Sequence, residues 1–414
     1  MRFRSDAMAA LLSACLLTSC SKSRAPAGGS EGSTSAAAPA VQQRTTRGDL
    51  ALRNLGGRIE LLEQRAKRRD LALPARGQLV DALLQRTQFL GTFDDFTRAL
   101  ELADAAVRDF PQKPDAWLLR ARARSAVHRF DDALGDLDMA AGLGADVDAR
   151  RASIHIALGR DLDKARAFAS ARVERAPKLE QLGLLANAEA ALGDFDAADR
   201  HYQAALDTLR DVSPFPVAQL SFQRGVMWAE LAHQPERALP YYAEAVRRIP
   251  EYVVANVHLA ELEAARGQRD AAIQRLRSVV ERGGTPGRDP EPLGVLAALL
   301  LAHDPNDGAA ADLIRRARSG YESLLAQHRL AFLDHGAEFF GGPGGDGPLA
   351  LQLARENLAL RRTPRAYGLA IERAFGASDT ALACRWLAEA GAVRAHSPEL
   401  AALLDRESAR CGSR

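Results

Sequence analysis

Small side chains recur along the chain at intervals close to 34 residues, and this period constrains the fold more than any other feature. An alanine marks the start of the second helix in each expected helix–turn–helix unit. Successive alanines lie 34, 32, 33, 40 and 34 residues apart. A period of this length is typical of arrays in which stacked helical hairpins share one continuous core. The six alanines are Ala99, Ala133, Ala165, Ala198, Ala238 and Ala272.

Composition favours an all-α chain with a large buried core. Hydrophobic residues make up 47% of the 414 residues and aromatic residues only 6%. Ala, Leu, Arg, Asp and Glu dominate, and these residues mostly favour helices over strands. The formal net charge is +2, with both signs mixed along the sequence. A nucleic-acid-binding protein normally presents a basic face, so the charge argues against that class of partner.

Other positions repeat in register with the alanines. Residues 12 places earlier are mostly small, as two antiparallel helices require where they cross closely. These residues are Thr87, Ala121, Ser153, Ala186, Val226 and Ala260, and a proline closes three units at Pro111, Pro177 and Pro250. Residues 130–133 (Phe-Asp-Asp-Ala) and 193–198 (Gly-Asp-Phe-Asp-Ala-Ala) carry the turns, and Trp117 stands at an aromatic position. The pattern resembles the tetratricopeptide repeat. That resemblance implies an all-α solenoid of helical hairpins coiled into a right-handed superhelix.

The expected organisation has five parts. Residues 1–19 form a signal peptide, 20–48 a disordered linker, and 49–78 a capping helix region. About six repeats occupy residues 79–284, and degenerate hairpins with a closing helix occupy 285–411. The interval of 40 residues contains a loop insertion, Arg210 to Pro216.

The N-terminus predicts a lipid anchor. Arg2 and Arg4 precede a short apolar stretch that ends at Leu17-Thr18-Ser19-Cys20. The stretch is too short to span a bilayer and is typical of a signal peptide. It resembles the lipobox of bacterial lipoproteins, which implies lipidation of Cys20 and a place in the cell envelope, on the outer membrane. Two alternatives stay open: a lipobox ending at Cys15, and an ordinary signal peptide with an incidental cysteine.

Catalytic motifs for phosphate binding, metalloprotease or serine-hydrolase chemistry are absent from the sequence. We therefore expect no enzyme, no cofactor, no metal site and no small-molecule substrate. The glycine-rich segment 341–347 lacks the lysine and the preceding strand of a phosphate-binding loop, and a long turn explains it better. An enzymatic alternative would need a buried cluster around His328, His335 and Asp346.

Cys384 and Cys411 are the two cysteines left once Cys15 is removed and Cys20 is lipidated. An oxidising compartment permits a disulfide between them, and two free buried thiols are the alternative.

The resemblance implies that the first helix of each hairpin lines a concave groove that binds a protein or peptide. The expected groove residues are Arg122, Arg150, Asn187, Gln223 and Glu261. The expected function is that of a membrane-anchored scaffold or adaptor for protein–protein interaction. The alternative is an assembly factor or chaperone for outer-membrane or secreted proteins.

Overall fold

The computed structural model describes residues 43–67, 71–282 and 287–412. These residues form an all-α array, which confirms the expected fold class; the expected signal peptide and Cys20 lie outside them. The helices are α1 (Gly48–Lys67), α2 (Leu73–Leu90), α3 (Asp94–Asp109), α4 (Pro114–Ala126), α5 (Phe130–Gly142), α6 (Asp148–Leu158), α7 (Leu162–Arg175), α8 (Leu179–Leu192), α9 (Phe195–Asp207), α10 (Pro214–Val226), η1 (Met227–Leu231), α11 (Pro235–Arg248), α12 (Val253–Ala265), α13 (Arg269–Arg282), α14 (Glu291–His303), α15 (Gly308–His328), η2 (Arg329–Phe332), α16 (Leu333–Gly341), α17 (Gly347–Leu360), α18 (Pro364–Gly376), α19 (Thr380–Ala390), η3 (Gly391–His396) and α20 (Pro398–Ser408).

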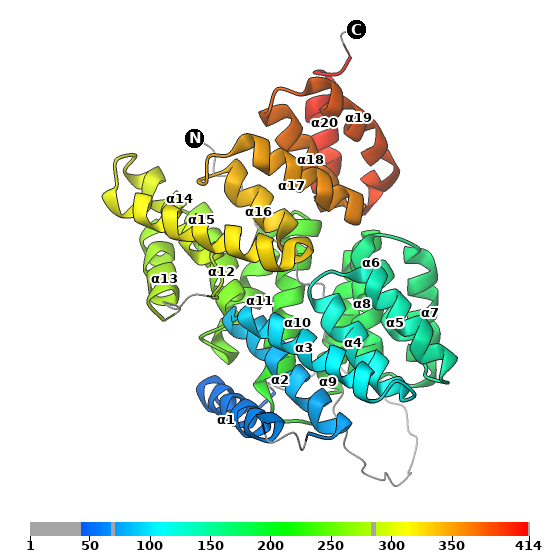
Figure 1. The fold of residues 1–414 in the computed structure, drawn as a ribbon. Coiled ribbons are helices and arrows are strands. Elements are labelled where there is room, and N and C mark those ends of the chain that lie inside the picture. Colours follow the sequence, from blue (N-terminus) through cyan, green and yellow to red (C-terminus); the bar gives the residue numbers. More distant parts are fainter. Residues whose placement is uncertain (1–42, 68–70, 283–286, 413–414) are drawn as a thin grey trace, which may run out of the picture.

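Consecutive helices pair as hairpins from α2–α3 to α18–α19, with α1 and α20 at the two ends (Figure 1). The hairpin α8–α9 shows how the sequence builds one. Gly193 adopts φ 85°, which ends α8 in the left-handed conformation that glycine tolerates. The next residue, Asp194, then accepts a hydrogen bond from the backbone N–H of Ala197 and caps α9. Ala198 is fully buried where the two helices meet.

The array coils until its first hairpins touch much later ones. The ring of Phe89 at the end of α2 packs against Phe215 and Tyr252, with ring centroids 5.0 and 4.6 Å away. Phe93 in the next turn meets Phe332 of η2 at 4.8 Å. In Figure 1 the blue helix α2 accordingly lies beside the green helix α10, which comes much later in the chain. A core cluster therefore joins hairpins that are far apart in the sequence.

Two of the expected boundaries between parts of the chain do not coincide with the elements that the structure shows. The boundary between residues 78 and 79 falls inside α2, because that helix begins at Leu73 with Pro74 in its first turn. Residues 43–47, the end of the expected linker, lie against the array. The N–H of Thr46 donates to the carbonyl oxygen of Val212 at 2.7 Å, and Arg248 donates to the carbonyl oxygen of Gln43 at 2.6 Å. The expected boundary at residue 284 lies outside the described residues.

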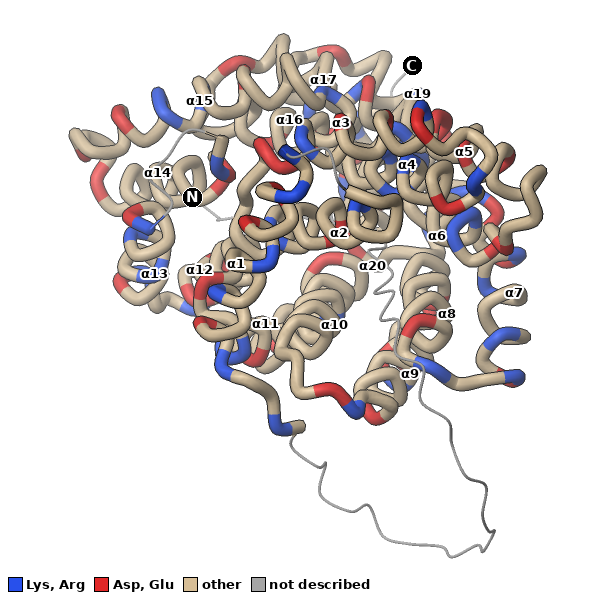
Figure 2. The backbone as a smooth tube through the Cα atoms, turned by 60° about the horizontal axis from the view of Figure 1, so that its bottom comes forward, with Lys and Arg blue, Asp and Glu red and all other residues tan. Residues whose placement is uncertain are grey.

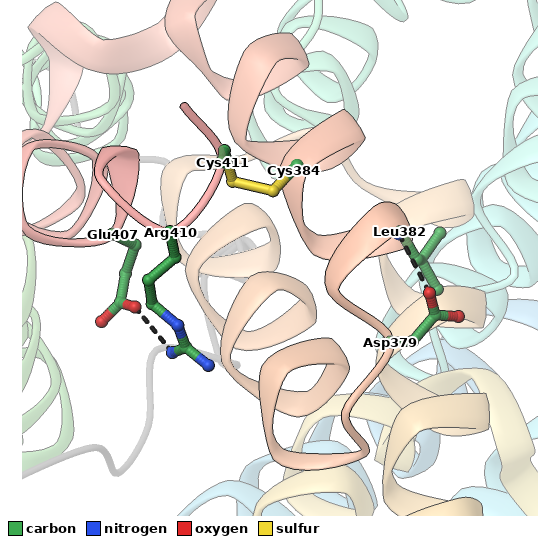
Figure 3. The surroundings of a disulfide bond; sticks show 6 residues. All are labelled: Asp379, Leu382, Cys384, Glu407, Arg410 and Cys411. Atoms are coloured by element: carbon green, nitrogen blue, oxygen red, sulfur yellow. Dashed lines mark hydrogen bonds and ion pairs between the residues drawn. A yellow bond between two sulfur atoms is a disulfide. The ribbon is translucent and has the colours of Figure 1, made fainter. Parts of the chain in front are cut away.

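The C-terminal end is closed covalently. The sulfur atoms of Cys384 and Cys411 form a disulfide that ties α19 to the residues after α20, with Cα atoms 5.6 Å apart (Figure 3). Asp379 accepts a hydrogen bond from the backbone N–H of Leu382 and caps the N-terminus of α19. In the part of the chain that the structure describes, no helix is both long enough and apolar enough to cross a lipid bilayer.

Candidate functional site

A groove of about 890 Å³ lies between the N-terminal helices and the loop insertion. We call it the N-terminal groove. Each of α1, α2 and α4 contributes one stripe of side chains to it, α6 contributes Arg150, and residues 211–215 form part of its wall. The stripes are Ala51, Asn54, Leu55 and Arg58 on α1, Gln78, Asp81, Gln85 and Gln88 on α2, and Asp115, Leu118, Leu119 and Arg122 on α4.

Amide side chains give the groove its chemistry. Four amides line it, and within the described chain none of them makes a side-chain hydrogen bond to another residue. An amide offers both donors and an acceptor, so a row of them can bond an extended peptide backbone. Apolar side chains also line the groove, and Val212 in its wall is 60% exposed. The amides are Asn54, Gln78, Gln85 and Gln88.

The charges of the groove divide into paired and unpaired groups. Arg122 is bonded to Asp81 across the α2–α4 contact. The half-buried Arg150 makes no hydrogen bond or ion pair to any described residue. Burial lowers the pKa of the Arg150 guanidinium, and the charges of Asp146 and Asp115 partly offset that effect. Arginine stays protonated regardless, so the groove contains a half-buried cation that has no bonded anion among the described residues.

The five residues that were expected to line one groove lie at different places in the structure. Arg122 and Arg150 lie together in the N-terminal groove. The side-chain oxygen of Asn187 accepts a hydrogen bond of 2.6 Å from the hydroxyl of Tyr202 in its own hairpin. Gln223 is half-buried on α10. Glu261 lines a second cavity, described next.

The second cavity, which we call the seam cavity, has a volume of about 650 Å³ and lies among η1, α12, α16, α18 and α20. Arg365, one of the lining residues, donates to Glu230 at 3.1 Å and also bonds Glu338. Burial raises the pKa of the Glu230 carboxyl well above its ordinary value, although the charge of Arg365 opposes this. The cavity thus surrounds an ion-pair network between distant hairpins.

The cluster named in the enzymatic alternative does not assemble. His328 bonds the hydroxyl of Thr97 at 3.0 Å, and Asp346 caps α17. His335 instead lines a cavity of about 30 Å³ beside Asp289 and Glu291. That volume admits about two water molecules and no organic substrate. No group of three side chains suited to a metal ion occurs among the described residues.

The missed groove residues on α2 had a signal in the sequence. Residues 78, 81, 85 and 88 are polar and spaced three or four apart, which places them on one face of a helix. The opposite face carries buried leucines at 79 and 83. Periodicity alone does not tell a solvated face from a groove, because both are polar.

One segment of the chain matches a known repeat family. Residues 230–299 match the model of the tetratricopeptide repeat family. Among solved structures, the chain is similar to the Cut9–Hcn1 hetero-tetramer of the APC/C, at 15% identity over 86% of this chain and 73% of that one, with a TM-score of 0.44. It is also similar to YrrB, described as a tetratricopeptide repeat protein with an unusual peptide-binding site, at 18% identity over 56% of this chain and 95% of that one, with a TM-score of 0.28. No curated protein matches the sequence.

Proposed function

We propose that this chain, a solenoid that contains tetratricopeptide repeats, is a lipid-anchored scaffold that holds a segment of a partner protein in its N-terminal groove. The observation that carries the proposal is the set of four amide side chains along that groove, which make no hydrogen bond to another described residue. A volume of about 890 Å³ is in the range of specific ligand sites, and it is lined by both polar and apolar groups.

The partner would bind as an extended strand rather than as a folded surface. The N-terminal groove is concave, and its amide side chains can replace the hydrogen bonds that an extended peptide backbone makes with water. The apolar side chains between them, Leu118 and Val212 among others, would contact alternate side chains of the segment. Basic and acidic residues are interspersed along described helices such as α1 and α13 (Figure 2).

Site-specific photocrosslinking in membranes tests this proposal. A photoreactive residue at Gln85, inside the groove, is expected to capture a discrete protein. The matched control carries the same residue at Glu101, an exposed position on α3 outside the groove. Equal capture from both positions, or capture from neither, would contradict the groove as the binding site. The identity of the captured protein then separates an adaptor from an assembly factor.

The anchor is a separate part of the proposal and rests on the sequence of residues 1–20 alone. We expect metabolic labelling with radioactive palmitate to mark the wild-type chain and a Cys15→Ser variant. A Cys20→Ser variant is expected to remain unlabelled and to leave the membrane fraction. Labelling that survives Cys20→Ser and is lost in Cys15→Ser would move the anchor to the alternative lipobox.

A further inference from the structure

Helix α1 has an apolar side that the rest of the array does not cover. The helix lies near the lower edge of the molecule in Figure 1 and packs chiefly against α2. Leu50 is 43% exposed and Leu61 is 59% exposed. The two leucines are 11 residues apart, which is about three turns, so they lie on one side of the helix. Among the described residues no other helix carries two exposed large apolar side chains. The opposite side of α1 carries its buried residues, which include Ala51, Leu55, Ile59 and Leu62.

Arginines surround the two exposed leucines. Arg53 follows Leu50 by three residues and Arg65 follows Leu61 by four, and side chains at these spacings are neighbours on a helix surface. Residues 43–67 contain six basic and three acidic side chains, a net charge of +3, whereas the whole chain carries +2. This first segment is therefore more basic than the rest of the chain.

The acidic side chains of α1 cancel only part of that charge. Glu63 accepts hydrogen bonds from Arg98 on α3 and so points toward the array. Asp49 accepts from both Arg47 and Arg53, which leaves one positive charge in that group of three. Glu60 is exposed. The outward side of α1 thus keeps an excess of positive charge around its leucines.

Exposed leucines among arginines have the chemistry of a helix that lies on a negatively charged lipid surface. The apolar side chains can enter the boundary between headgroups and acyl chains, and the guanidinium groups can bond lipid phosphates. The position of α1 in the chain favours the same partner. Gln43, the first described residue before α1, lies 23 residues after Cys20, a distance that the chain spans in at most about 80 Å.

We propose that the outward side of α1 docks on an anionic phospholipid surface, with Leu50 and Leu61 inserted and the surrounding arginines on the lipid phosphates. This contact orients the array relative to the membrane, whereas an acyl chain on Cys20 limits only its distance from the bilayer. The inference rests on the proposed lipid anchor for the nearness of the membrane, and it adds the face of the protein that meets the lipid.

Cosedimentation with vesicles tests this contact. The protein is the chain from residue 20 onward with Cys20→Ser, so that no acyl chain holds it on the membrane. Vesicles contain either phosphatidylcholine alone or phosphatidylcholine and phosphatidylglycerol in equal parts, at low ionic strength. We expect binding to the vesicles with phosphatidylglycerol to be at least about tenfold tighter than to the others, because the attraction is largely electrostatic.

Two pairs of variants locate the contact. Arg53→Glu is expected to weaken binding at least about fivefold, whereas its matched control Arg315→Glu should stay within about twofold of the wild type. The side chains of Arg53 and Arg315 are 72% and 74% exposed, and each pairs with an aspartate on its own helix. Leu61→Gln should weaken binding at least about threefold, and Met139→Gln, which replaces an exposed apolar side chain on α5, should not. Circular dichroism confirms that each variant is folded.

A Leu61→Trp variant gives a readout that misfolding does not imitate. Tryptophan favours the membrane interface, so this variant should bind at least as tightly as the wild type. Brominated acyl chains in the vesicles with phosphatidylglycerol should quench the emission that the variant adds to that of the wild type.

Absence of binding, equal binding to both kinds of vesicle, equal losses in Arg53→Glu and Arg315→Glu, or unquenched added emission would each overturn the inference. The vesicle assay contains neither an acylated cysteine nor a partner protein. Its failure is therefore distinguishable from failure of the proposed function, which palmitate labelling and photocrosslinking at Gln85 test.

Discussion

At the scale of single residues, buried ion pairs hold the helices of a hairpin in register. The Asp136 side chain on α5 is 2% exposed and accepts hydrogen bonds from Arg120 at 2.7 Å and Arg124 at 2.8 Å, both on α4. A carboxylate can accept several donors, so one buried anion satisfies two cations. The same helix carries Asp138, which is 71% exposed and pairs with Arg151. The two aspartates have the same chemistry and very different surroundings.

Replacing Asp136 by alanine is expected to lower the free energy of unfolding by about 3–5 kcal/mol, because it leaves two partly buried guanidinium groups without their acceptor. The control, Asp138→Ala, removes only an exposed ion pair and should cost less than about 1 kcal/mol. Urea denaturation followed by circular dichroism measures both. Equal losses in the two variants would contradict the role assigned to burial.

His258 predicts a pH dependence. Its side chain is 3% exposed and stacks on Tyr242, and burial lowers its pKa to about 3. The unfolded chain binds a proton at this histidine below about pH 6.5, whereas the folded chain does not. The stability that the neutral His258 contributes is therefore fully present above about pH 6.5, and it is lost as the pH falls below that value.

Between pH 6.5 and pH 5 the wild type should lose about 2 kcal/mol that a His258→Phe variant does not lose. Burial also raises the pKa of Glu230, whose carboxyl oxygen lies 3.3 Å from the Nδ1 atom of His258, and that group contributes to the pH dependence in the opposite direction. The measurement is the free energy of unfolding at the two pH values. Parallel pH profiles for the two proteins would show that His258 is not buried as a neutral ring.

At the scale of helices, close crossings depend on which residue lacks a side chain. A β-carbon placed on Gly225 of α10 would come within 2.4 Å of the Tyr242 ring on α11. The sequence register had assigned the small position to Val226, one residue later. The π-helix η1 follows directly at Met227–Leu231, and a π-turn holds one residue more than an α-turn. The extra residue explains why the small side chain falls one place earlier.

Gly225→Ala is expected to destabilise the protein by about 1–3 kcal/mol, because the fully buried Tyr242 has no space to move away. Gly183→Ala is the matched control: it lies inside α8, where an added Cβ meets nothing within 4 Å. That variant should be stabilised by about 0.5–1 kcal/mol through helix propensity alone. Thermal denaturation shows whether each variant is less or more stable than the wild type. A Gly225→Ala variant as stable as the wild type, or more stable, would contradict the close contact between Gly225 and Tyr242.

At the scale of the whole molecule, contacts between distant hairpins close the coil. The N–H of Phe93 donates to the carbonyl oxygen of Gly287 at 2.9 Å, and the guanidinium of Arg288 donates to Thr92 at 2.9 Å. Further along, the N–H of Arg362 donates to the carbonyl oxygen of Leu158 at 3.1 Å. The stability of an ordinary repeat array is a sum over neighbouring units. Here early hairpins also contact segments that come much later in the chain.

A double-mutant cycle measures that dependence. Phe93→Leu and Phe332→Leu should show a coupling energy of about 0.5–1.5 kcal/mol, because each ring packs edge-on against the other. Phe168→Leu on α7 combined with Phe332→Leu is the control pair, with no ring contact between the two, and should be additive. Additivity in the first pair would mean that the coil is open in solution.

The sequence by itself determined the hairpins. Their period, their turns and the helix types follow from contacts within about 34 residues, because capping residues such as Asp194 and small residues such as Ala198 act on their immediate neighbours. Tertiary structure alone decided which of the expected groove residues share a groove. Asn187 bonds within its hairpin, Glu261 lies in the seam cavity, and Arg150 faces the N-terminal groove without a bonded partner among the described residues. The physical reason is that the small rotation between successive hairpins accumulates along the array, and no local spacing in the sequence encodes the sum.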